Sequence, residues 1–475
     1  MAFLTEAANR GSIGGYDIDN SCKFEQDNSE SMTRTATQSQ GGNRKTWTWS
    51  GWIKRTELGR HMYLFSAGGT GFEILSNDNL RFSLYYNNTS YYLDLNAKLR
   101  DTSAWYHIVG QLDTTQSTAQ DRVKVWINGE RQTSFSNDSA HNIPQNADVQ
   151  HLNEATGTST GWMKICDWYA SGRFFSGYTA DWYFTDGVAN EPTEFGEYDS
   201  NSGIWIPKEY DGSYGTNGFY LDFADASDLG DDESGNGNDF SEGNLTSADQ
   251  STDTPTNNFS TGNLLGPFRV GHWNFTEGAT YAQYAGGNDW GSFTNTMAVG
   301  SGKWYVEIQA GGSDLFVGAG SEDYNFVGAG NGAGFPEIYY GYTGTNSVGY
   351  HANNGDVYNN GTQTVIGTTY TTNDIISVAL DMDNGKIYFA KNGTYINSQN
   401  PVTGANSIAL PDTSARYFIG GSSYGTGKNH RCNYGGYTTM SISSAASDEN
   451  GYGTFEYAPP SGYYALCTKN LAEYG

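Results

Sequence analysis

The sequence predicts an all-β protein of two tandem antiparallel β-sandwiches, joined by an acidic linker rich in Gly, Asn and Ser. Gly (62 residues), Tyr (35 residues) and small polar residues dominate the 475-residue chain, which favours strands and tight turns. Few segments repeat apolar residues with the 3.6-residue period of a helix. Two segments alternate apolar residues beside Asn-Gly pairs, namely residues 123–129 (VKVWING) and 384–393 (NGKIYFAKNG). Such pairs predict type I′ hairpin turns, because both residues tolerate positive φ.

Composition and charge exclude several functions. The chain is too long for one sandwich and long enough for two domains with separate cores. A net charge of −27 argues against nucleic-acid binding, which needs clusters of Lys and Arg. The sequence contains no run of 18 apolar residues, so no membrane span is predicted. The N-terminus lacks the pattern of a secretory signal. The four cysteines have no metal or redox spacing, so we expect buried, reduced thiols, with a Cys432–Cys467 bridge as the alternative.

The first half of the chain has the rhythm of a sandwich. We expect residues 1–40 to be mostly irregular, with one strand near 21–24, and residues 41–224 to form the first domain. Alternation with a period of two marks strands that have one buried face. The strand candidates of this domain are 46–53, 62–66, 71–75, 80–86, 91–95, 105–112, 123–127, 162–169 and 178–185.

The second half is separated from the first by a polar segment. Residues 225–262 combine several Asp residues with Gly, Asn and Ser and offer little apolar surface to bury, so they predict the acidic linker. Residues 263–450 predict the second sandwich, and the Pro-limited residues 451–475 an extended C-terminal tail. The strand candidates here are 302–308, 315–319, 374–381, 386–390 and 417–420.

Each half carries motifs of a known domain class. The first half has residues 47–53 (WTWSGWI), 105–109 (WYHIV), 123–129 and 177–187 (GYTADWYFTDG), and it resembles concanavalin-like jelly rolls of the laminin-G and pentraxin type. The second half resembles a SPRY-type sandwich in residues 302–308 (GKWYVEI), 355–361 (GDVYNNG) and 374–389 (DIISVALDMDNGKIYF). The resemblance implies a jelly roll followed by a SPRY-like domain.

The tandem order of the domains is the more specific resemblance. Together with residues 195–199 (FGEYD), 215–223 (GTNGFYLDF), 253–259 (DTPTNNF) and 459–462 (PPSG), it looks like virion proteins of tailed bacteriophages, marine ones especially. This resemblance implies a non-enzymatic structural protein on the virion surface, assembled in the host cytoplasm. It implies a structural or host-attachment protein and no particular place on the particle, and the function we expect is host attachment, as a tail fibre or head fibre, through carbohydrate or protein binding.

The resemblance also implies partners and leaves alternatives open. The partners are other virion proteins, of the capsid or the tail, and a host cell-surface glycan or protein. A homo-oligomer is an alternative to a monomer. A second hypothesis is a capsid decoration or cementing protein without receptor binding, which predicts a large apolar docking surface. A third is a glycan-degrading enzyme, which predicts carboxylates converging in a cleft.

Two aromatic segments are the candidate ligand-binding loops. Tyr rings can stack on sugar rings while amides bind hydroxyl groups, and such mixtures recur in recognition loops. The alternative is that these rings pack on a sheet face. The candidates are Tyr85, Tyr86, Asn87, Asn88, Tyr91 and Tyr92 at a predicted hairpin tip, and Tyr339, Tyr340 and Tyr342 in the second half.

The sequence contains weak matches to catalytic motifs. Residues 25–30 (EQDNSE) match the E-x-D-x-x-E pattern of glucanases that share the jelly-roll fold, but the polar residues between the acids predict a solvated turn. Residues 157–161 and 421–425 match G-x-S-x-G without a following helix. The Gly-rich residues 328–334 lack the Lys and helix of a phosphate loop. His107 is expected at the edge of a core.

Metal binding has little support in the sequence. The seven histidines form no ligand pattern, so no transition-metal site is predicted. Asp232, Ser234, Asn236 and Gly237 begin like a calcium loop, but Glu242 falls one position short of the bidentate ligand. Concanavalin-like domains often bind Ca²⁺ through Asp or Asn of rim loops. We expect no cofactor, with Ca²⁺ as the alternative that the resemblance implies.

Overall fold

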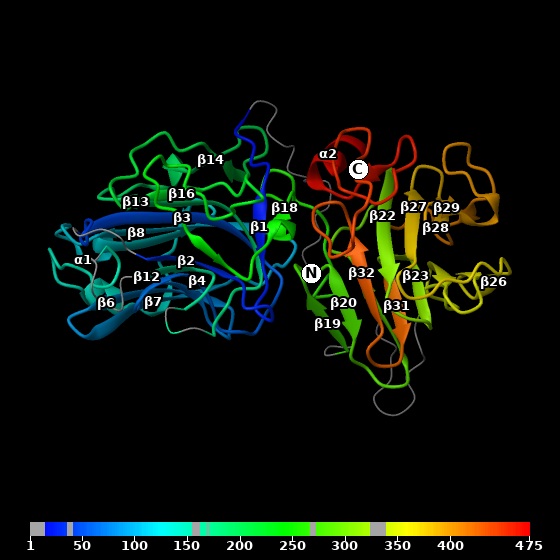
Figure 1. Ribbon diagram of the computed structural model, residues 1–475, viewed down its shortest axis with the longest axis horizontal. Coiled ribbons are helices and arrows are strands. Elements are labelled where there is room, and N and C mark those ends of the chain that lie inside the picture. The colour runs from blue at the N-terminus through cyan, green and yellow to red at the C-terminus, as the bar shows by residue number, and fades with distance from the viewer. Residues whose placement is uncertain are drawn as a thin grey trace. The chain divides into compact units, whose positions relative to one another are not determined.

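The chain folds into two compact units, Ser12–Asn257 and Asn258–Gly475 (Figure 1). The structure is a computed structural model that describes residues 15–35, 41–153, 162–168, 170, 172–266, 272–323 and 339–475. Nearly all regular elements are strands. The predicted class of two tandem antiparallel β-sandwiches is therefore confirmed. No helix among the described residues is long and apolar enough to cross a membrane.

The first unit is a sandwich of two sheets, drawn one above the other in Figure 1. We call them the back sheet and the front sheet. The back sheet runs β10 (Glu130–Arg131), β9 (Val123–Ile127), β8 (Trp105–Asp113), β3 (Thr46–Arg55), β13 (Gly177–Asp186), β1 (Ser21–Phe24) and β18 (Gln250–Ser251), with β16 (Phe219–Leu221) also on β13. The front sheet runs β11 (Phe135–Asn137), β7 (Thr89–Lys98), β6 (Asn79–Tyr86), β5 (Thr70–Ile74), β4 (Met62–Ala67), β12 (Trp162–Ile165), β2 (Ser31–Thr35) and β17 (Ser241–Gly243).

Short elements complete the first unit. A separate two-stranded sheet pairs β14 with β15, and the helices are single turns. These elements are β14 (Gly196–Tyr198), β15 (Trp205–Pro207), α1 (Ala119–Arg122), η1 (Ser139–Asn142), η2 (Pro192–Glu194) and η3 (Ser247–Asp249).

The second unit is also a two-sheet sandwich. One sheet runs β19 (Trp273–Thr276), β20 (Tyr281–Tyr284), β32 (Asn429–Asn433), β22 (Lys303–Ala310), β27 (Ile375–Asp381), β28 (Lys386–Lys391) and β29 (Thr394–Tyr395), with β30 (Ile408–Ala409) on β28 and β33 (Tyr464–Ala465) parallel to β22. The other runs β21 (Trp290–Thr294), β31 (Tyr417–Tyr424), β23 (Leu315–Ser321), β24 (Ser347–His351), β25 (Val357–Asn359) and β26 (Thr362–Thr364). Two short helices, η4 (Ile396–Ser398) and α2 (Thr468–Tyr474), complete it.

Aromatic side chains fill the core of the first unit. Phe72 and Phe82 lie opposite each other on β5 and β6, and their rings stack at 4.2 Å. Trp49 on β3 of the back sheet stacks on Phe72 at 4.8 Å, so the two sheets meet through aromatic rings. All three side chains are fully buried. The strands keep their register because a slip of one residue would turn these rings to solvent.

The Asn-Gly turns agree with the expectation at two of three places. Asn128 and Gly129 between β9 and β10 both have positive φ (49° and 77°), as do Asn392 and Gly393 between β28 and β29 (47° and 77°). These are the φ signs of a type I′ turn. The loop before β28 differs, because Gly385 has positive φ but Asn384 does not. That connection is longer than two residues, so it does not need the type I′ geometry.

The structure differs from the expectation of an irregular start and an acidic linker. β1 and β2 lie inside the two sheets of the first unit, and β18 and β17 from residues 225–262 pair with them. Leu229 and Phe240 from this polar segment are buried in the core. Residues 225–257 are thus part of the first unit, because strand pairing and the buried side chains of Leu229, Phe240 and Leu245 hold a segment that has few apolar residues.

The C-terminal residues also differ from the expected extended tail. β33 pairs with β22, and α2 follows it directly. Tyr463, Ala465, Leu466 and Cys467 are buried against the second unit. The buried side chains at 463 and 465–467 give this segment a core face, which the Pro residues before it obscured in the sequence.

A buried ion pair fixes the end of the first unit. Lys54 Nζ on β3 lies 2.6 Å from Asp253 Oδ2, and both side chains are 0% exposed. Trp105 Nε1 donates a hydrogen bond to Asp253 Oδ1 at 3.1 Å. Each charge has a partner, which is the condition for burying an ion pair at a tolerable cost.

We predict that Asp253→Ala lowers the free energy of unfolding of the first unit by about 3–5 kcal/mol, because it leaves the Lys54 ammonium buried without its counter-ion. Urea unfolding followed by tryptophan fluorescence measures this loss. The matched control is Asp228→Ala, which removes an exposed carboxylate from the same segment. Equal stability of both variants would contradict the structural role of Asp253.

Candidate functional site

The predicted tyrosine hairpin exists, but its rings lie on both faces of the front sheet. Asn87 and Asn88 form the turn between β6 and β7 with φ of 47° and 58°. Tyr86 faces Thr89 and Leu84 faces Tyr91 across the hairpin, whereas Tyr85 faces Ser90 and Ser83 faces Tyr92. Directly opposed residues share a face, and neighbours along a strand alternate. The four tyrosines therefore separate into two pairs.

The two pairs have different surroundings. Tyr86 and Tyr91 are half-buried and pack against the core of the first unit. Tyr85 and Tyr92 lie on the outer face, where Tyr85 stacks on His151 at 4.4 Å and Tyr92 lies under the Arg81 guanidinium at 4.3 Å. The hairpin thus does not bring all four rings together, and only the outer pair is placed for contact with a ligand on this face.

The outer face of the front sheet carries a line of polar side chains, which we call the outer-face row. It consists of Tyr63 on β4, Glu73 on β5, Arg81 on β6 and Asp94 on β7. The strand register places each directly opposite the next. The core residues Phe72 and Phe82 alternate with them on the opposite face. The same alternation that builds the core therefore builds this row, across about 14 Å at the usual spacing of strands.

Hydrogen bonds fix the charged groups of the row. Arg81 donates to both Asp94 oxygens, from Nε at 2.5 Å and from Nη2 at 2.9 Å. Glu73 contacts His61 Nε2 and accepts a hydrogen bond from Ser83 Oγ at 2.5 Å. Burial by itself would raise the pKa of Glu73, but the hydrogen bonds and charges of His61, Ser83 and Arg81 lower it below the usual value.

Aromatic rings flank the row at its β4 end. His61 stacks on Tyr63 at 5.6 Å, and Trp168 stacks on Tyr63 at 6.1 Å. The Arg173 guanidinium lies over the Trp168 ring at 4.6 Å and within 3.5 Å of His61 Nε2. Tyr63 and Glu73 are buried, whereas the His61 side chain is 28% exposed and Trp168 and Arg173 are half-exposed.

The outer-face row suits binding better than catalysis. The fixed guanidinium of Arg81, whose side chain is 22% exposed, offers donors to hydroxyl groups, and the partly exposed rings beside the row offer flat apolar faces. A glycosidase acid must hold a proton near neutral pH, which requires a raised pKa. The lowered pKa of Glu73 is the opposite condition.

The second aromatic segment forms a cluster on the outer face of the second unit. Tyr339 stacks on Phe316 at 4.6 Å and contacts Trp290 and Tyr342 at ring distances of 5.1 and 5.2 Å. Tyr340 differs from the expectation of a binding residue, since it is fully buried and donates a hydrogen bond to the Phe293 carbonyl at 2.8 Å. The remaining residues of the predicted loop, 335–338, lie outside the described residues.

The E-x-D-x-x-E segment differs from the expected solvated turn. Asp27 is exposed, but Glu25 and Glu30 are buried. Glu30 forms an ion pair with Lys23 at 2.9 Å, and Glu25 accepts a hydrogen bond from Ser176 at 3.0 Å. These contacts connect β1 to its neighbours, so we assign the two carboxylates a structural role.

Two Ser–His pairs lie in the interior. Ser423, from the G-x-S-x-G match, contacts His430 Nε2 at 3.1 Å, and both residues are fully buried. Ser423 lies within β31, where a nucleophile elbow would need a turn into a helix.

His107 contacts Ser50 at 2.8 Å and accepts a hydrogen bond from Trp205 at 2.9 Å. Burial lowers the pKa of His107 to about 3, so it is a neutral core residue and not a core-edge one. The matches at 157–161 and 328–334 lie outside the described residues.

No metal centre forms among the described parts of the chain, where no three His, Cys, Asp or Glu side chains converge. The oxygens of Asp232 accept hydrogen bonds from its own loop, from Ser234 N at 2.9 Å and Asn238 N at 2.8 Å, and from Tyr220 N at 2.9 Å. The four cysteines are buried, and no disulfide joins Cys432 to Cys467.

Asp181 is a buried carboxyl group with three phenol partners. It lies at a bulge of β13 with a φ of 47° and accepts hydrogen bonds from the hydroxyls of Tyr16 (3.3 Å), Tyr183 (3.2 Å) and Tyr220 (3.0 Å). Burial raises the pKa of Asp181 to about 7, against the opposing effect of the three hydrogen bonds. All its neighbours are structural side chains, so we assign it to the fold.

Comparison with known proteins identifies both domains. The concanavalin A-like lectin/glucanases superfamily matches residues 27–163, and the SPRY domain matches residues 302–403. The chain thus carries a concanavalin-like domain followed by a SPRY domain, as the sequence motifs predicted. Domains of these two classes are generally binding domains and not enzymes. Among curated proteins, none matches this chain.

Solved structures similar to each unit have low sequence identity. The SPRY domain of human HERC1 is 18% identical, with 33% of this chain and 89% of that chain covered at a TM-score of 0.25. The TRIM65 PSpry domain is 11% identical. The match covers 37% of this chain and 91% of that chain, with a TM-score of 0.28. A heptameric SAP-like pentraxin from Limulus polyphemus is 16% identical. The match covers 38% of this chain and 82% of that chain, with a TM-score of 0.26.

Sequence reasoning missed most of the outer-face row. Glu73 and Arg81 occupy the outward positions of two correctly predicted strands, so period-two alternation could have assigned them to one face. The register that sets them opposite each other, and the placement of Trp168 and Arg173 beside Tyr63, are not written in any local pattern.

We predict that Tyr91→Ala lowers the free energy of unfolding by about 1–3 kcal/mol, because its ring packs on the core. Tyr92→Ala should lower it by less than about 1 kcal/mol, because its ring lies on the outer face beside Arg81. Urea unfolding of the two single variants measures the difference. A larger loss for Tyr92→Ala would reverse the assignment of the two faces.

We also predict that Asp181 makes the first unit less stable as pH rises. Between about pH 4 and 7 the unfolded chain has lost the proton that folded Asp181 keeps, so the free energy of unfolding falls with rising pH in that window. Asp181→Asn should remove this part of the pH dependence, whereas the exposed control Asp228→Asn should not. Parallel pH profiles of wild type and Asp181→Asn would contradict the prediction.

Proposed function

We propose that this protein is a non-enzymatic binding protein on the surface of a bacteriophage particle, of tail-fibre or head-fibre type. It attaches the particle to a carbohydrate on the host cell. In this proposal the first unit makes the contact through the outer-face row and its flanking rings, and other surfaces of the chain dock to capsid or tail proteins. Such a protein would be assembled in the host cytoplasm and act at the virion surface.

The outer-face row is the observation that carries the proposal. Arg81, whose side chain is 22% exposed, is held by two hydrogen bonds to Asp94 on a rigid sheet, so little entropy is lost when a ligand binds it. Trp168 and His61 supply partly exposed rings next to these charges. Weak binding at one such site would be multiplied by many copies on one particle. The phage setting is supported by the sequence resemblance of the tandem domains.

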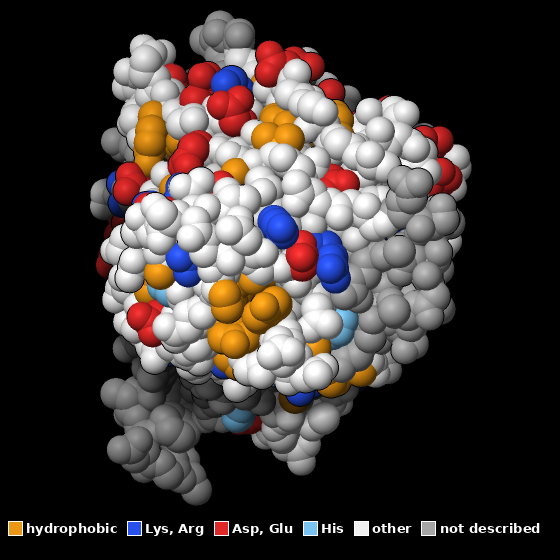
Figure 2. Space-filling model, turned by 90° about the vertical axis from the view of Figure 1, so that its left-hand side faces the viewer, with side chains coloured by type: hydrophobic (Ala, Val, Ile, Leu, Met, Phe, Trp, Pro, Cys, Tyr) orange, Lys and Arg blue, Asp and Glu red, His pale blue; other side chains and the backbone are white. Residues whose placement is uncertain are grey.

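The decoration hypothesis receives less support. A cementing protein needs a large apolar docking surface. The exposed large hydrophobic side chains within the described parts of the chain are Tyr198, Leu265, Val365 and Val402, which are scattered along the sequence. Figure 2 looks onto the first unit, where the hydrophobic side chains show as several small, separate patches.

We predict that Trp168→Ala weakens binding of the full chain to host cells and to host envelope glycans by about tenfold or more, because it removes a partly exposed ring of the site. A glycan array and a cell-retention assay measure this. The matched control is Tyr198→Ala, which removes an aromatic ring that is 48% exposed on β14, away from the row. It should bind as the wild type does.

Three outcomes would overturn parts of the proposal. A wild-type chain that retains neither host cells nor envelope glycans would exclude attachment. Antibody labelling of the chain only on capsid faces, far from contact with cells, would favour decoration. Release of reducing sugar from host polysaccharide would exclude a non-enzymatic role.

A further inference from the structure

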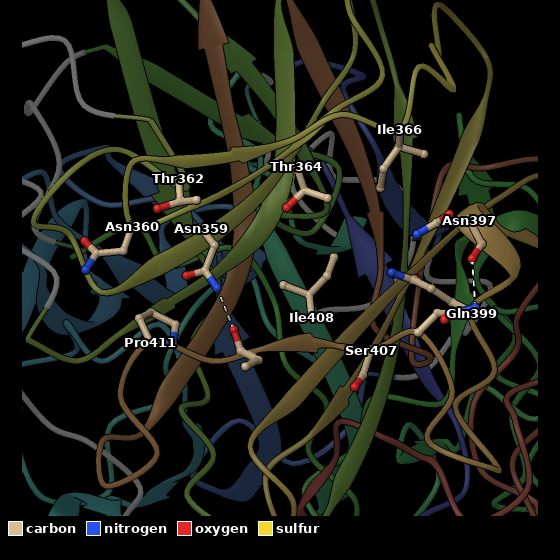
Figure 3. A pocket seen from close by; sticks show the side chains of 12 residues that line it. Asn359, Asn360, Thr362, Thr364, Ile366, Asn397, Gln399, Ser407, Ile408 and Pro411 are labelled. Atoms are coloured by element: carbon tan, nitrogen blue, oxygen red, sulfur yellow. Dashed lines mark hydrogen bonds between the residues drawn. The ribbon is translucent and has the colours of Figure 1, made fainter.

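The second unit contains a cavity of about 540 Å³ at the edges of its two sheets (Figure 3). Its walls come from the β25–β26 hairpin on one side and from η4, β30 and the loop between them on the other. This volume lies within the range of about 300–1,000 Å³ that is usual for small-molecule sites. The cavity shares no lining residue with the aromatic cluster around Tyr339.

One buried amide in the cavity wall has a donor without an acceptor. Gln399 is 5% exposed, and its Oε1 accepts a hydrogen bond from the Phe389 backbone N–H at 2.8 Å. This bond fixes the orientation of the amide, since the opposite orientation would set its NH₂ group against a donor. Gln399 Nε2 is buried and has no hydrogen-bond partner among the residues that the structure describes. A buried donor without a partner costs free energy, which a ligand oxygen would recover.

Two further amides are held so that their oxygens remain as acceptors. Asn406 Nδ2 donates to the backbone carbonyls of Asn397 at 3.2 Å and Ser398 at 3.1 Å. Asn359 Nδ2 donates to the Ala409 carbonyl at 2.8 Å, drawn as a dashed line in Figure 3. Both amides line the cavity with Gln399. The wall therefore presents one fixed donor and two fixed acceptors without reorganisation.

The rest of the lining limits the chemistry of the ligand. Ile366 and Ile408 are half-buried and give the cavity an apolar wall. No charged side chain is among its lining residues in the described part of the chain. A phosphate, sulfate or carboxylate ligand would have no counter-charge there. A hydroxyl group both donates and accepts, so it can meet the Gln399 donor and the Asn359 and Asn406 acceptors.

We propose that this cavity is a binding site for a neutral saccharide, separate from the outer-face row. The ring hydroxyls bind the three fixed amides, and the C–H face of the ring packs on Ile366 and Ile408. The site discriminates against sugar acids, because a carboxylate would lie in an uncharged wall and could satisfy none of the acceptors.

The test uses the full chain and the matched probes glucose and glucuronate, with galactose, mannose and N-acetylglucosamine as further neutral sugars. Saturation-transfer NMR detects binding and calorimetry gives the affinity. Gln399→Glu keeps the acceptor for the Phe389 N–H but removes the donor, and it should weaken neutral-sugar binding by about tenfold or more. Thr364→Trp introduces a large side chain at an exposed lining position and should abolish binding without entering a core.

Controls separate this site from folding and from the first unit. Thr371→Trp makes the same substitution at an exposed threonine outside the cavity and should bind as the wild type does. Trp168→Ala should also leave this binding unchanged, so a failure here does not bear on the outer-face row. The thermal midpoint of each variant confirms that it is folded.

The proposal is overturned by any of three results. The first is that none of the neutral sugars binds the wild type. The second is that Thr364→Trp binds a neutral sugar as tightly as Thr371→Trp does. The third is that glucuronate binds the wild type at least as tightly as glucose. A screen in which only extended peptides compete for the cavity would assign it to peptide binding at the β26 edge, which also excludes the saccharide site.

Discussion

The alternation of side chains along antiparallel strands is the constraint on which the rest of this structure depends. In the front sheet it sends Phe72 and Phe82 into the core and Glu73 and Arg81 to the outer face, one residue away. The aromatic core holds the register, and the register in turn sets the charged groups of the outer-face row opposite one another. Core and candidate site are therefore two faces of one pairing pattern, and neither can shift without the other.

Buried polar contacts compensate for a chain with few apolar residues. Lys54 and Asp253 neutralise each other in the interior, and the loop around Asp232 satisfies its own carboxylate. Such contacts let the polar residues 225–257 join the first unit, with Leu229, Phe240 and Leu245 as large apolar anchors in its core. A low content of apolar residues thus marks a polar but ordered segment here, and not a flexible connection.

Buried polar contacts also explain why groups that resemble catalytic residues serve ligand binding or the stability of the fold instead of catalysis. Glu73 has a lowered pKa and several donors, Glu30 is paired with Lys23, and the Ser423–His430 pair is closed off in the core. A catalytic acid or nucleophile must be reachable and must change its protonation state during the reaction. The lowered pKa of Glu73 keeps this group ionised, and burial encloses Glu30 and the Ser423–His430 pair, which favours recognition of a ligand over its conversion.

The sequence by itself determined the fold class, most strands of both sandwiches and the order of the two domains. It also determined the hairpin turn between Tyr86 and Thr89. These features follow from period-two patterns and turn residues, which are local in the sequence. Only the tertiary structure decided which tyrosines face the core, that β17 and β18 complete the first unit, and that Trp168 lies beside Tyr63. Strand register and sheet order join residues far apart in the chain, so no local pattern specifies them. The cavity around Gln399 has the same origin, since it forms where the edges of two sheets meet.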